Sequence, residues 1–128
     1  MAVDLSMPVL VVDDYKTMVR IVQNLLKTLG FTDVRGATSG AQALDMMAET
    51  PFGLVISDWN MEPMSGLGLL KRVRAHADHH ALPFIMVTAE SKTDRVIAAK
   101  EAGVSSYIVK PFDARTLKRK IAAVMGGF

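Results

Sequence analysis

Short aliphatic runs alternate along the chain with longer segments in which apolar residues recur every three or four positions. A continuous aliphatic run is typical of a strand buried on both faces of a sheet, and the three-and-four spacing is typical of a helix with one apolar face. Strands are therefore predicted at residues 9–12, 32–37, 54–56, 84–87 and 107–109. Helices are predicted at residues 15–29, 40–48, 67–75, 91–103 and 113–125, with Ser91 and Asp113 as the caps of the last two.

The order of these elements, a strand followed by a helix five times over, predicts an α/β fold. Parallel strands joined by helices form a sheet that is covered on both faces, with right-handed crossovers. Ligands of such open sheets bind outside the carboxyl ends of the strands. Residues that carry function are therefore expected directly after each strand.

The chain has 128 residues, of which 50% are hydrophobic and 22% charged, which is enough apolar material for one domain with a core. It contains no cysteine, which excludes a disulfide scaffold, a thiolate zinc site and a cysteine nucleophile. No apolar run approaches the roughly 18 residues of a membrane span. Asp4, Asp13 and Asp14 flank the short apolar run near the N-terminus, which argues against a secretory signal. We therefore expect a soluble, cytoplasmic protein.

The formal net charge of +2 does not by itself indicate a nucleic-acid partner. Four residues make the last predicted helix basic: Arg115, Lys118, Arg119 and Lys120. Binding of nucleic acid needs a groove-reading element or an aromatic platform, and neither is evident. A solvated face, or a surface for an acidic partner, is the preferred interpretation.

Three histidines, His76, His79 and His80, cluster around the end of the third predicted helix. The spacing of His76 and His80 can chelate a metal when both lie on one helix. Because no strand-end carboxylate or thiolate accompanies them, a solvated helix end is favoured.

Five polar residues stand at the ends of predicted strands: Asp13, Asp14, Asp58, Thr88 and Lys110. Converging carboxylates repel one another and are costly to desolvate unless a cation neutralises them. A ligand set made of oxygen atoms alone suits a hard cation, and Mg²⁺ fits best because it combines one or two carboxylates with water and phosphate. Lys110 would supply a positive charge to a phosphate oxygen, and Thr88 a hydroxyl donor.

A purely structural interpretation is also open. Asp13 or Asp14 could cap the following helix, and Lys110 could form a structural ion pair with Asp58. A functional site is favoured because the whole set, rather than one pair, falls at strand ends.

These strand-end residues, in this order and spacing, resemble the receiver domain of two-component response regulators over about residues 8–124. The motifs that carry the resemblance are Asp13-Asp14, Asp58-Trp59-Asn60-Met61, Thr88-Ala89-Glu90, Tyr107 and Lys110-Pro111-Phe112. They are most similar to the chemotaxis members of the family. The resemblance implies a doubly wound, flavodoxin-like sheet of five parallel strands in the order 2-1-3-4-5, with residues 1–128 as a single receiver domain and no output domain.

The resemblance also implies the role of each residue at the site. Asp58 would be the nucleophile that accepts a phosphoryl group from a phosphohistidine of a sensor kinase. Asp14 and Asp58 would bind Mg²⁺ through their carboxylates, Asp13 partly through water, and Asn60 through its backbone carbonyl. The activity would be limited to the protein's own phosphorylation and dephosphorylation, so the protein is not expected to be an enzyme acting on a separate substrate.

Further implied roles concern the phosphoryl group and the response to it. Thr88 and Lys110 would contact the phosphoryl oxygens, with the Lys110-Pro111 peptide in the cis form. Thr88 and Tyr107 would form the switch, and Glu90 would modulate the reaction.

One loop departs from the family. In the run Met61-Glu62-Pro63-Met64-Ser65-Gly66 the proline stands one place later than is common, so the shape of this loop is open. Glu62 could lie near the metal, although a solvated carboxylate is the preferred interpretation.

Three functions are compatible with the sequence. The first is a stand-alone, monomeric switch in chemotaxis, phosphorylated by a chemotaxis histidine kinase and read by the flagellar motor switch protein. The second is a phosphate shuttle or sink in a phosphorelay. The third is a flavodoxin-like flavin binder, which is disfavoured because the turn at Asp13-Asp14 is acidic and lacks donors for a flavin phosphate.

Overall fold

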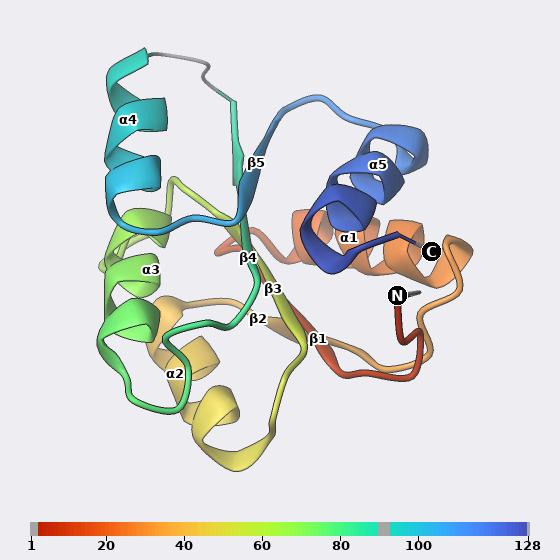
Figure 1. Cartoon of the computed structure of the whole chain (residues 1–128), viewed down its shortest axis with the longest axis horizontal. Coiled ribbons are helices and arrows are strands. Elements are labelled where there is room, and N and C mark those ends of the chain that lie inside the picture. Colours follow the sequence, from red (N-terminus) through yellow and green to blue (C-terminus); the bar gives the residue numbers. More distant parts are fainter. Residues whose placement is uncertain (1–2, 90–92, 128) are drawn as a thin grey trace.

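The computed structural model describes residues 3–89 and 93–127, and within these ranges strands and helices alternate along the chain (Figure 1). The strands are β1 Val9–Val12, β2 Val34–Ala37, β3 Leu54–Asp58, β4 Phe84–Thr88 and β5 Ser106–Val109. The helices are α1 Lys16–Thr28, α2 Gly40–Glu49, α3 Gly66–Ala75, α4 Thr93–Glu101 and α5 Ala114–Met125. Every predicted element is present. The predicted helix cap Ser91 lies outside the described residues.

The five strands form one parallel sheet in the order β2-β1-β3-β4-β5, which confirms the predicted doubly wound topology. The strand ends are in register: Val12 lies opposite Ser57 in β3, and Thr88 lies opposite Val109 in β5. β3 and β4 continue to Asp58 and Thr88, beyond their predicted aliphatic ends. The polar residues after each strand are thereby brought to one edge of the sheet.

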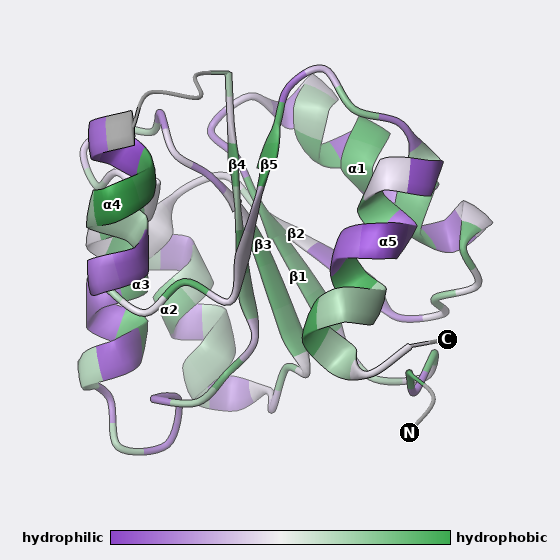
Figure 2. Ribbon diagram, turned by 45° about the horizontal axis from the view of Figure 1, so that its top comes forward, coloured by the Kyte–Doolittle hydropathy of each residue, from purple (hydrophilic) through white to green (hydrophobic). Residues whose placement is uncertain are grey.

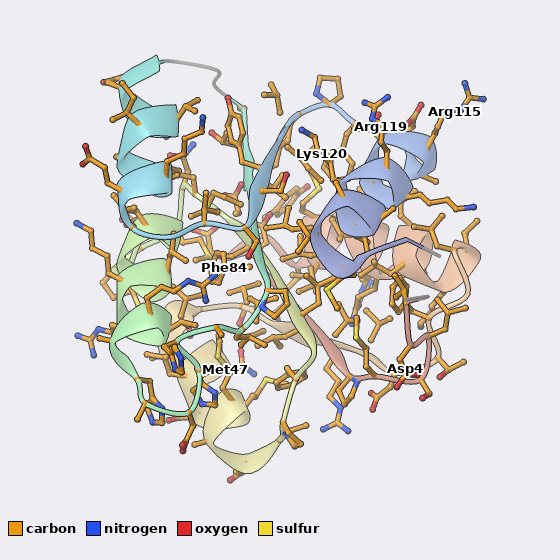
Figure 3. The ribbon with its side chains drawn as sticks, viewed as in Figure 1. Asp4, Met47, Phe84, Arg115, Arg119 and Lys120 are labelled. Atoms are coloured by element: carbon orange, nitrogen blue, oxygen red, sulfur yellow. The ribbon has the colours of Figure 1, made fainter. Side chains whose placement is uncertain are left out.

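Helices cover both faces of the sheet, with α2, α3 and α4 on one side and α1 and α5 on the other (Figures 1 and 2). Each face of the sheet packs against its helices in a separate core cluster. In β1, Leu10 and Val12 belong to the cluster under α2, α3 and α4, and Val9 and Val11 belong to the cluster under α1 and α5. Phe84 and Met47 lie in the first of these clusters (Figure 3). This two-sided burial explains why the strands are continuous aliphatic runs. Among the described residues, no helix has the length and apolar character needed to cross a membrane.

Polar side chains fix the starts of three helices. The Ser39 side chain accepts a hydrogen bond from the Gln42 N–H, Ser65 accepts from the Gly68 N–H, and Asp113 accepts from the Thr116 N–H. Such caps satisfy backbone donors that have no partner within the helix.

The end of the sheet opposite the strand-end residues is tied together by Arg74, which stands in the last turn of α3. Its Nε donates to the carbonyl of Gly103 at 2.8 Å, and its Nη1 donates to the carbonyl of Leu82 at 2.6 Å. Burial lowers the pKa of this guanidinium. One side chain thereby joins α3 to the segment before β4 and to the loop that follows α4.

Candidate functional site

Three carboxylates meet at the carboxyl end of β1 and β3. Asp13 and Asp14 follow β1, Asp58 ends β3, and one oxygen of each lies within 4.8 Å of the others. Asp13 is 4% exposed and Asp58 6%, whereas Asp14 is exposed. The cluster therefore opens to solvent on the side of Asp14.

The local backbone explains the position of Asp13. Its N–H donates to the carbonyl of Ala37 in β2 at 3.1 Å, and its Oδ1 accepts from the Tyr15 N–H at 3.0 Å. Tyr15 is the N-cap of α1 and makes no side-chain cap bond. Neither Asp13 nor Asp14 is therefore the N-cap of α1. The helix-capping role that the structural interpretation gave to these two residues is wrong.

The electrostatics of the cluster favour a cation. Burial raises the pKa of the Asp13 carboxyl from 3.8 to about 6, and the charges of Asp58 and Asp14 act in the same direction. The Tyr15 N–H and Lys110 oppose this shift. A buried carboxylate that is costly to ionise, in a donor set made of oxygen atoms, fits a hard divalent cation.

Lys110 reaches into the same cluster from the end of β5. Its Nζ lies 2.8 Å from Asp58 Oδ1 and 3.8 Å from Asp13 Oδ2. Its N–H donates to the Thr88 carbonyl at 2.7 Å, and the Lys110-Pro111 peptide is cis, as predicted. The ion pair expected by the structural interpretation is present, but it lies inside the carboxylate cluster and is part of the site.

Thr88 lies between the strands that carry Asp58 and Lys110, and it is fully buried. In the sheet it is opposite Val109, and Met86 is opposite Tyr107. Since residues two apart on a strand share a face, Thr88 and Tyr107 project from the same face. The half-buried Tyr107 also lines a cavity of about 340 Å³ together with Lys100 and Lys120. The two predicted switch residues are therefore close enough in the sheet to be linked by packing.

The segment after Asp58 is held by its backbone. The Trp59 N–H donates to the Val87 carbonyl at 2.9 Å, and the Trp59 carbonyl accepts from the Gly66 N–H at 2.9 Å. Gly66 is required there because an added Cβ would collide with the Asp58 carbonyl oxygen. The Asn60 backbone, predicted as a metal ligand, follows directly in this loop.

The Asn60 side chain makes a contact that the sequence did not predict. Its Oδ1 accepts from Arg95 Nη1 at 3.2 Å, and the Arg95 guanidinium carbon lies 5.1 Å from the centroid of the Trp59 ring. Arg95 is one of several charged residues on α4 and follows no strand, so no local signal distinguished it. The modulating residue Glu90, which was predicted in the preceding segment, lies outside the described residues.

A cavity of about 400 Å³ lies beside the acidic cluster. It is lined by Asp14, Trp59, Asn60, Met61, Glu62, Ser65 and Arg95. Glu62 is exposed and, within the part of the chain that the structure describes, lies outside the carboxylate cluster, in keeping with a solvated residue. In the divergent loop, the Glu62-Pro63 peptide is cis.

A larger cavity, of about 600 Å³, lies between the carboxyl end of α2 and the segment after α3. His76, His79 and His80 line it, but α3 ends at Ala75, so the spacing of His76 and His80 is not helical. The rings of His76 and His79 stack with centroids 4.4 Å apart. Metal-binding geometry in the described residues is found at the aspartates and not at these histidines.

The site combines a nearly buried carboxylate, an ammonium group 2.8 Å from it and two further carboxylates. This is the chemistry of a carboxylate that can attack an electrophile whose oxygens are neutralised by positive charge. The acidic turn after β1 leaves the flavin interpretation without phosphate donors.

Comparison with known proteins identifies the family of this chain. The response regulator receiver domain model matches residues 9–122. The chemotaxis protein CheY-3 of Vibrio cholerae is 49% identical over 116 residues, covering 91% of this chain and 89% of that protein. The chemotaxis protein CheY of Pseudomonas aeruginosa is 48% identical over 118 residues, covering 92% of this chain and 95% of that protein.

A solved structure of the Vibrio cholerae chemotaxis protein CheY4 superimposes with a TM-score of 0.88 at 31% identity, covering 94% of this chain and 99% of that chain. The parallel sheet in the order β2-β1-β3-β4-β5 and its helices match the fold of that protein. The chain therefore belongs to the family of response regulator receiver domains, and within it to the CheY-like proteins.

Proposed function

We propose that this protein is a phosphorylation-dependent switch in chemotaxis, with Asp58 as the phosphoacceptor. The observation that carries the proposal is the position of the Asp58 carboxylate, nearly buried between the Lys110 ammonium and the carboxylates of Asp13 and Asp14. Similarity to two proteins that are named as chemotaxis proteins supports it.

In the proposed reaction, an Asp58 oxygen attacks the phosphorus of a phosphohistidine in a chemotaxis histidine kinase. The new O–P bond forms as the N–P bond breaks, and the leaving imidazole nitrogen keeps the electron pair and takes up a proton. Lys110 stabilises the negative charge on the phosphoryl oxygens, and the Thr88 hydroxyl donates to one of them. Attack by water later releases inorganic phosphate and restores the carboxylate, so no separate substrate is turned over.

Asp13, Asp14, Asp58 and the Asn60 carbonyl would hold Mg²⁺ in this site. When bound, the ion would neutralise charge on the phosphoryl oxygens. The all-oxygen donor set and the raised pKa of Asp13 both support such a cation.

The test of the phosphoacceptor is intact-mass measurement after incubation with acetyl phosphate and Mg²⁺. The wild type should gain one phosphoryl group, and Asp58→Asn should gain none. A phosphoryl group retained on Asp58→Asn would show that another residue is the acceptor.

The response would be read by a separate protein, which we propose is the flagellar motor switch protein. The surface formed by α4, β5 and α5 supports this, because its cavity is lined by Tyr107 and by the positively charged Lys100 and Lys120. Arg115 and Arg119 extend the charge along α5 (Figure 3). We further propose that the protein acts as a cytoplasmic monomer.

The partner can be tested by capture from a cell lysate with and without beryllium fluoride as a phosphoryl mimic. Recovery of the motor switch protein only in the activated sample is the expected result. Capture in neither sample would favour the phosphate sink over the motor switch.

A further inference from the structure

Arg95 joins α4 to the loop that follows the phosphoacceptor. The two residues it contacts, Trp59 and Asn60, come directly after Asp58, whereas Arg95 stands 35 residues beyond Asn60. Its guanidinium donates to Asn60 Oδ1 at 3.2 Å and lies over the Trp59 ring at 5.1 Å. The contact therefore bridges two separate elements at the opening of the site.

Arg95 lies against a residue, Trp59, that is buried and whose backbone is hydrogen-bonded on both sides. Trp59 is 8% exposed, and its backbone is bonded on one side to Val87 and on the other to Gly66. A planar guanidinium over an aromatic face has a defined orientation, which a flexible ammonium lacks. Arg95 can therefore hold the Asn60 amide in one position.

The position of this bridge matters for access of water. Asp13 and Asp58 are buried, and the cavity of about 400 Å³ that includes the exposed Asp14 is also lined by Asn60 and Arg95. Water that hydrolyses a phosphoaspartate must attack in line with the O–P bond, from the side of phosphorus away from the Asp58 oxygen. The cavity that Asn60 and Arg95 line lies on the exposed side of the cluster, so water that enters by this cavity passes both residues.

We propose that Arg95 is a positioning residue that prolongs the life of the phosphoaspartate, because together with Asn60 it narrows the approach of water to phosphorus. The inference rests on the proposed function of Asp58. Removal of Arg95 should release the Asn60 amide and widen the opening, so that hydrolysis becomes faster. Lysine at this position keeps a donor for Asn60 but loses the planar stacking, so its effect should be intermediate.

The experiment compares the wild type with Arg95→Ala, Arg95→Lys and the control Arg20→Ala, which alters an exposed arginine of α1 on the other face of the sheet (Figure 1). Each protein is phosphorylated with acetyl phosphate and Mg²⁺, the donor is removed, and loss of the phosphoryl group is followed by intact mass. One lost hydrogen bond corresponds to about threefold to tenfold in a rate, so Arg95→Ala should shorten the lifetime by that factor. Arg20→Ala should leave it unchanged.

A second measurement separates this inference from the proposed function. Trp59 is the single tryptophan of the chain, so quenching of its fluorescence by acrylamide reports access to the same opening without any phosphorylation. Quenching should increase in Arg95→Ala, increase less in Arg95→Lys and not change in Arg20→Ala.

The outcomes are distinct. If the wild type takes no phosphoryl group, the proposed function fails and the quenching series alone decides whether Arg95 closes the opening. If Arg95→Ala hydrolyses at the wild-type rate or more slowly, or is quenched no more than the wild type, the inference is wrong. Equal effects of the alanine and lysine variants, with a matching loss of thermal stability, would also overturn it in favour of a structural role.

Discussion

The carboxylate of Asp13 is costly to ionise because it is buried, but it is suited to binding a cation together with Asp14 and Asp58. Its burial raises the pKa of its carboxyl to about 6, and two neighbouring carboxylates add to the effect. Lys110, 2.8 Å from Asp58 Oδ1, offsets part of this repulsion. A divalent cation would neutralise the negative charge that Lys110 leaves uncompensated. The contribution of each carboxylate to cation binding can therefore be tested by substitution.

The substitution Asp14→Asn should weaken Mg²⁺ binding by at least about tenfold, because a charged ligand of the cation is replaced by a neutral one. Trp59 adjoins Asp58, so a titration of tryptophan fluorescence with Mg²⁺ measures the affinity. The matched control is Asp45→Asn, an exposed aspartate of α2, which should bind Mg²⁺ like the wild type. An unchanged affinity in Asp14→Asn would contradict the assignment.

Thr88 is predicted to link the phosphoryl group to the partner surface. Its hydroxyl is fully buried at the end of β4, on the same face of the sheet as Tyr107. Thr88→Ala should still be phosphorylated but should lose most of the phosphorylation-dependent gain in affinity for the partner, which a binding titration in both states measures. If the full gain is kept, the switch does not depend on Thr88.

At the scale of elements, the start of α3 controls the geometry of the site. An added Cβ at Gly66 would meet the Asp58 carbonyl oxygen, the Met86 sulfur and the Trp59 backbone. At Gly68, two residues later in the same helix, the nearest atom is the flexible Met64 Cγ at 3.3 Å. Two glycines of one helix thus differ in whether a side chain can be accommodated.

Gly66→Ala should therefore lower the free energy of unfolding by about 1–3 kcal/mol, because backbone atoms next to the phosphoacceptor must move. Gly68→Ala should be neutral or should stabilise by up to about 1 kcal/mol, since alanine favours a helix over glycine. Urea denaturation of both variants measures the difference. Equal free energies of unfolding in the two variants would mean that the loop after β3 can move to accommodate the added Cβ without loss of stability.

The cap of α5 gives a pH dependence. The hydrogen bonds that Asp113 accepts from Thr116 lower the pKa of its carboxyl below 3.8 in the folded protein. A carboxyl with a depressed folded pKa contributes stability above its unfolded pKa, and this contribution is lost as the pH falls through the folded value. Asp113→Asn keeps an acceptor for the cap but has no such titration.

The wild type should therefore lose thermal stability relative to Asp113→Asn as the pH is lowered from 5 through 3.8 and below, as seen in the difference between their melting temperatures. A difference that stays constant over this range would mean that the cap does not depend on the ionised carboxylate.

At the scale of the whole molecule, the sequence predicted the fold because its strands are aliphatic runs that lie in a sheet covered on both faces. The same topology brought Asp13, Asp58 and Lys110 to one edge, so their convergence could be predicted without coordinates. The predicted ends of β3 and β4 were short because Asp58 and Thr88 are polar yet continue the ladder. The contact of Arg95 with Asn60 could not be predicted, since it depends on how α4 packs against a loop 35 residues away.

Arg74 and Arg95 connect the two ends of α4 to the rest of the molecule. Arg74 binds the carbonyl of Gly103 directly after the carboxyl end of the helix, and Arg95 contacts the site from near its amino end. If the loop after Asp58 moved, α4 would therefore be expected to turn about its carboxyl end at Gly103. A small displacement of the loop after Asp58 would swing the amino end of the helix while the far end stays in place. The exposed Ile97, which is nearer the amino end, would then move farther than Lys100. The same residues would form the partner surface in both states, but the orientation of α4 within that surface would differ.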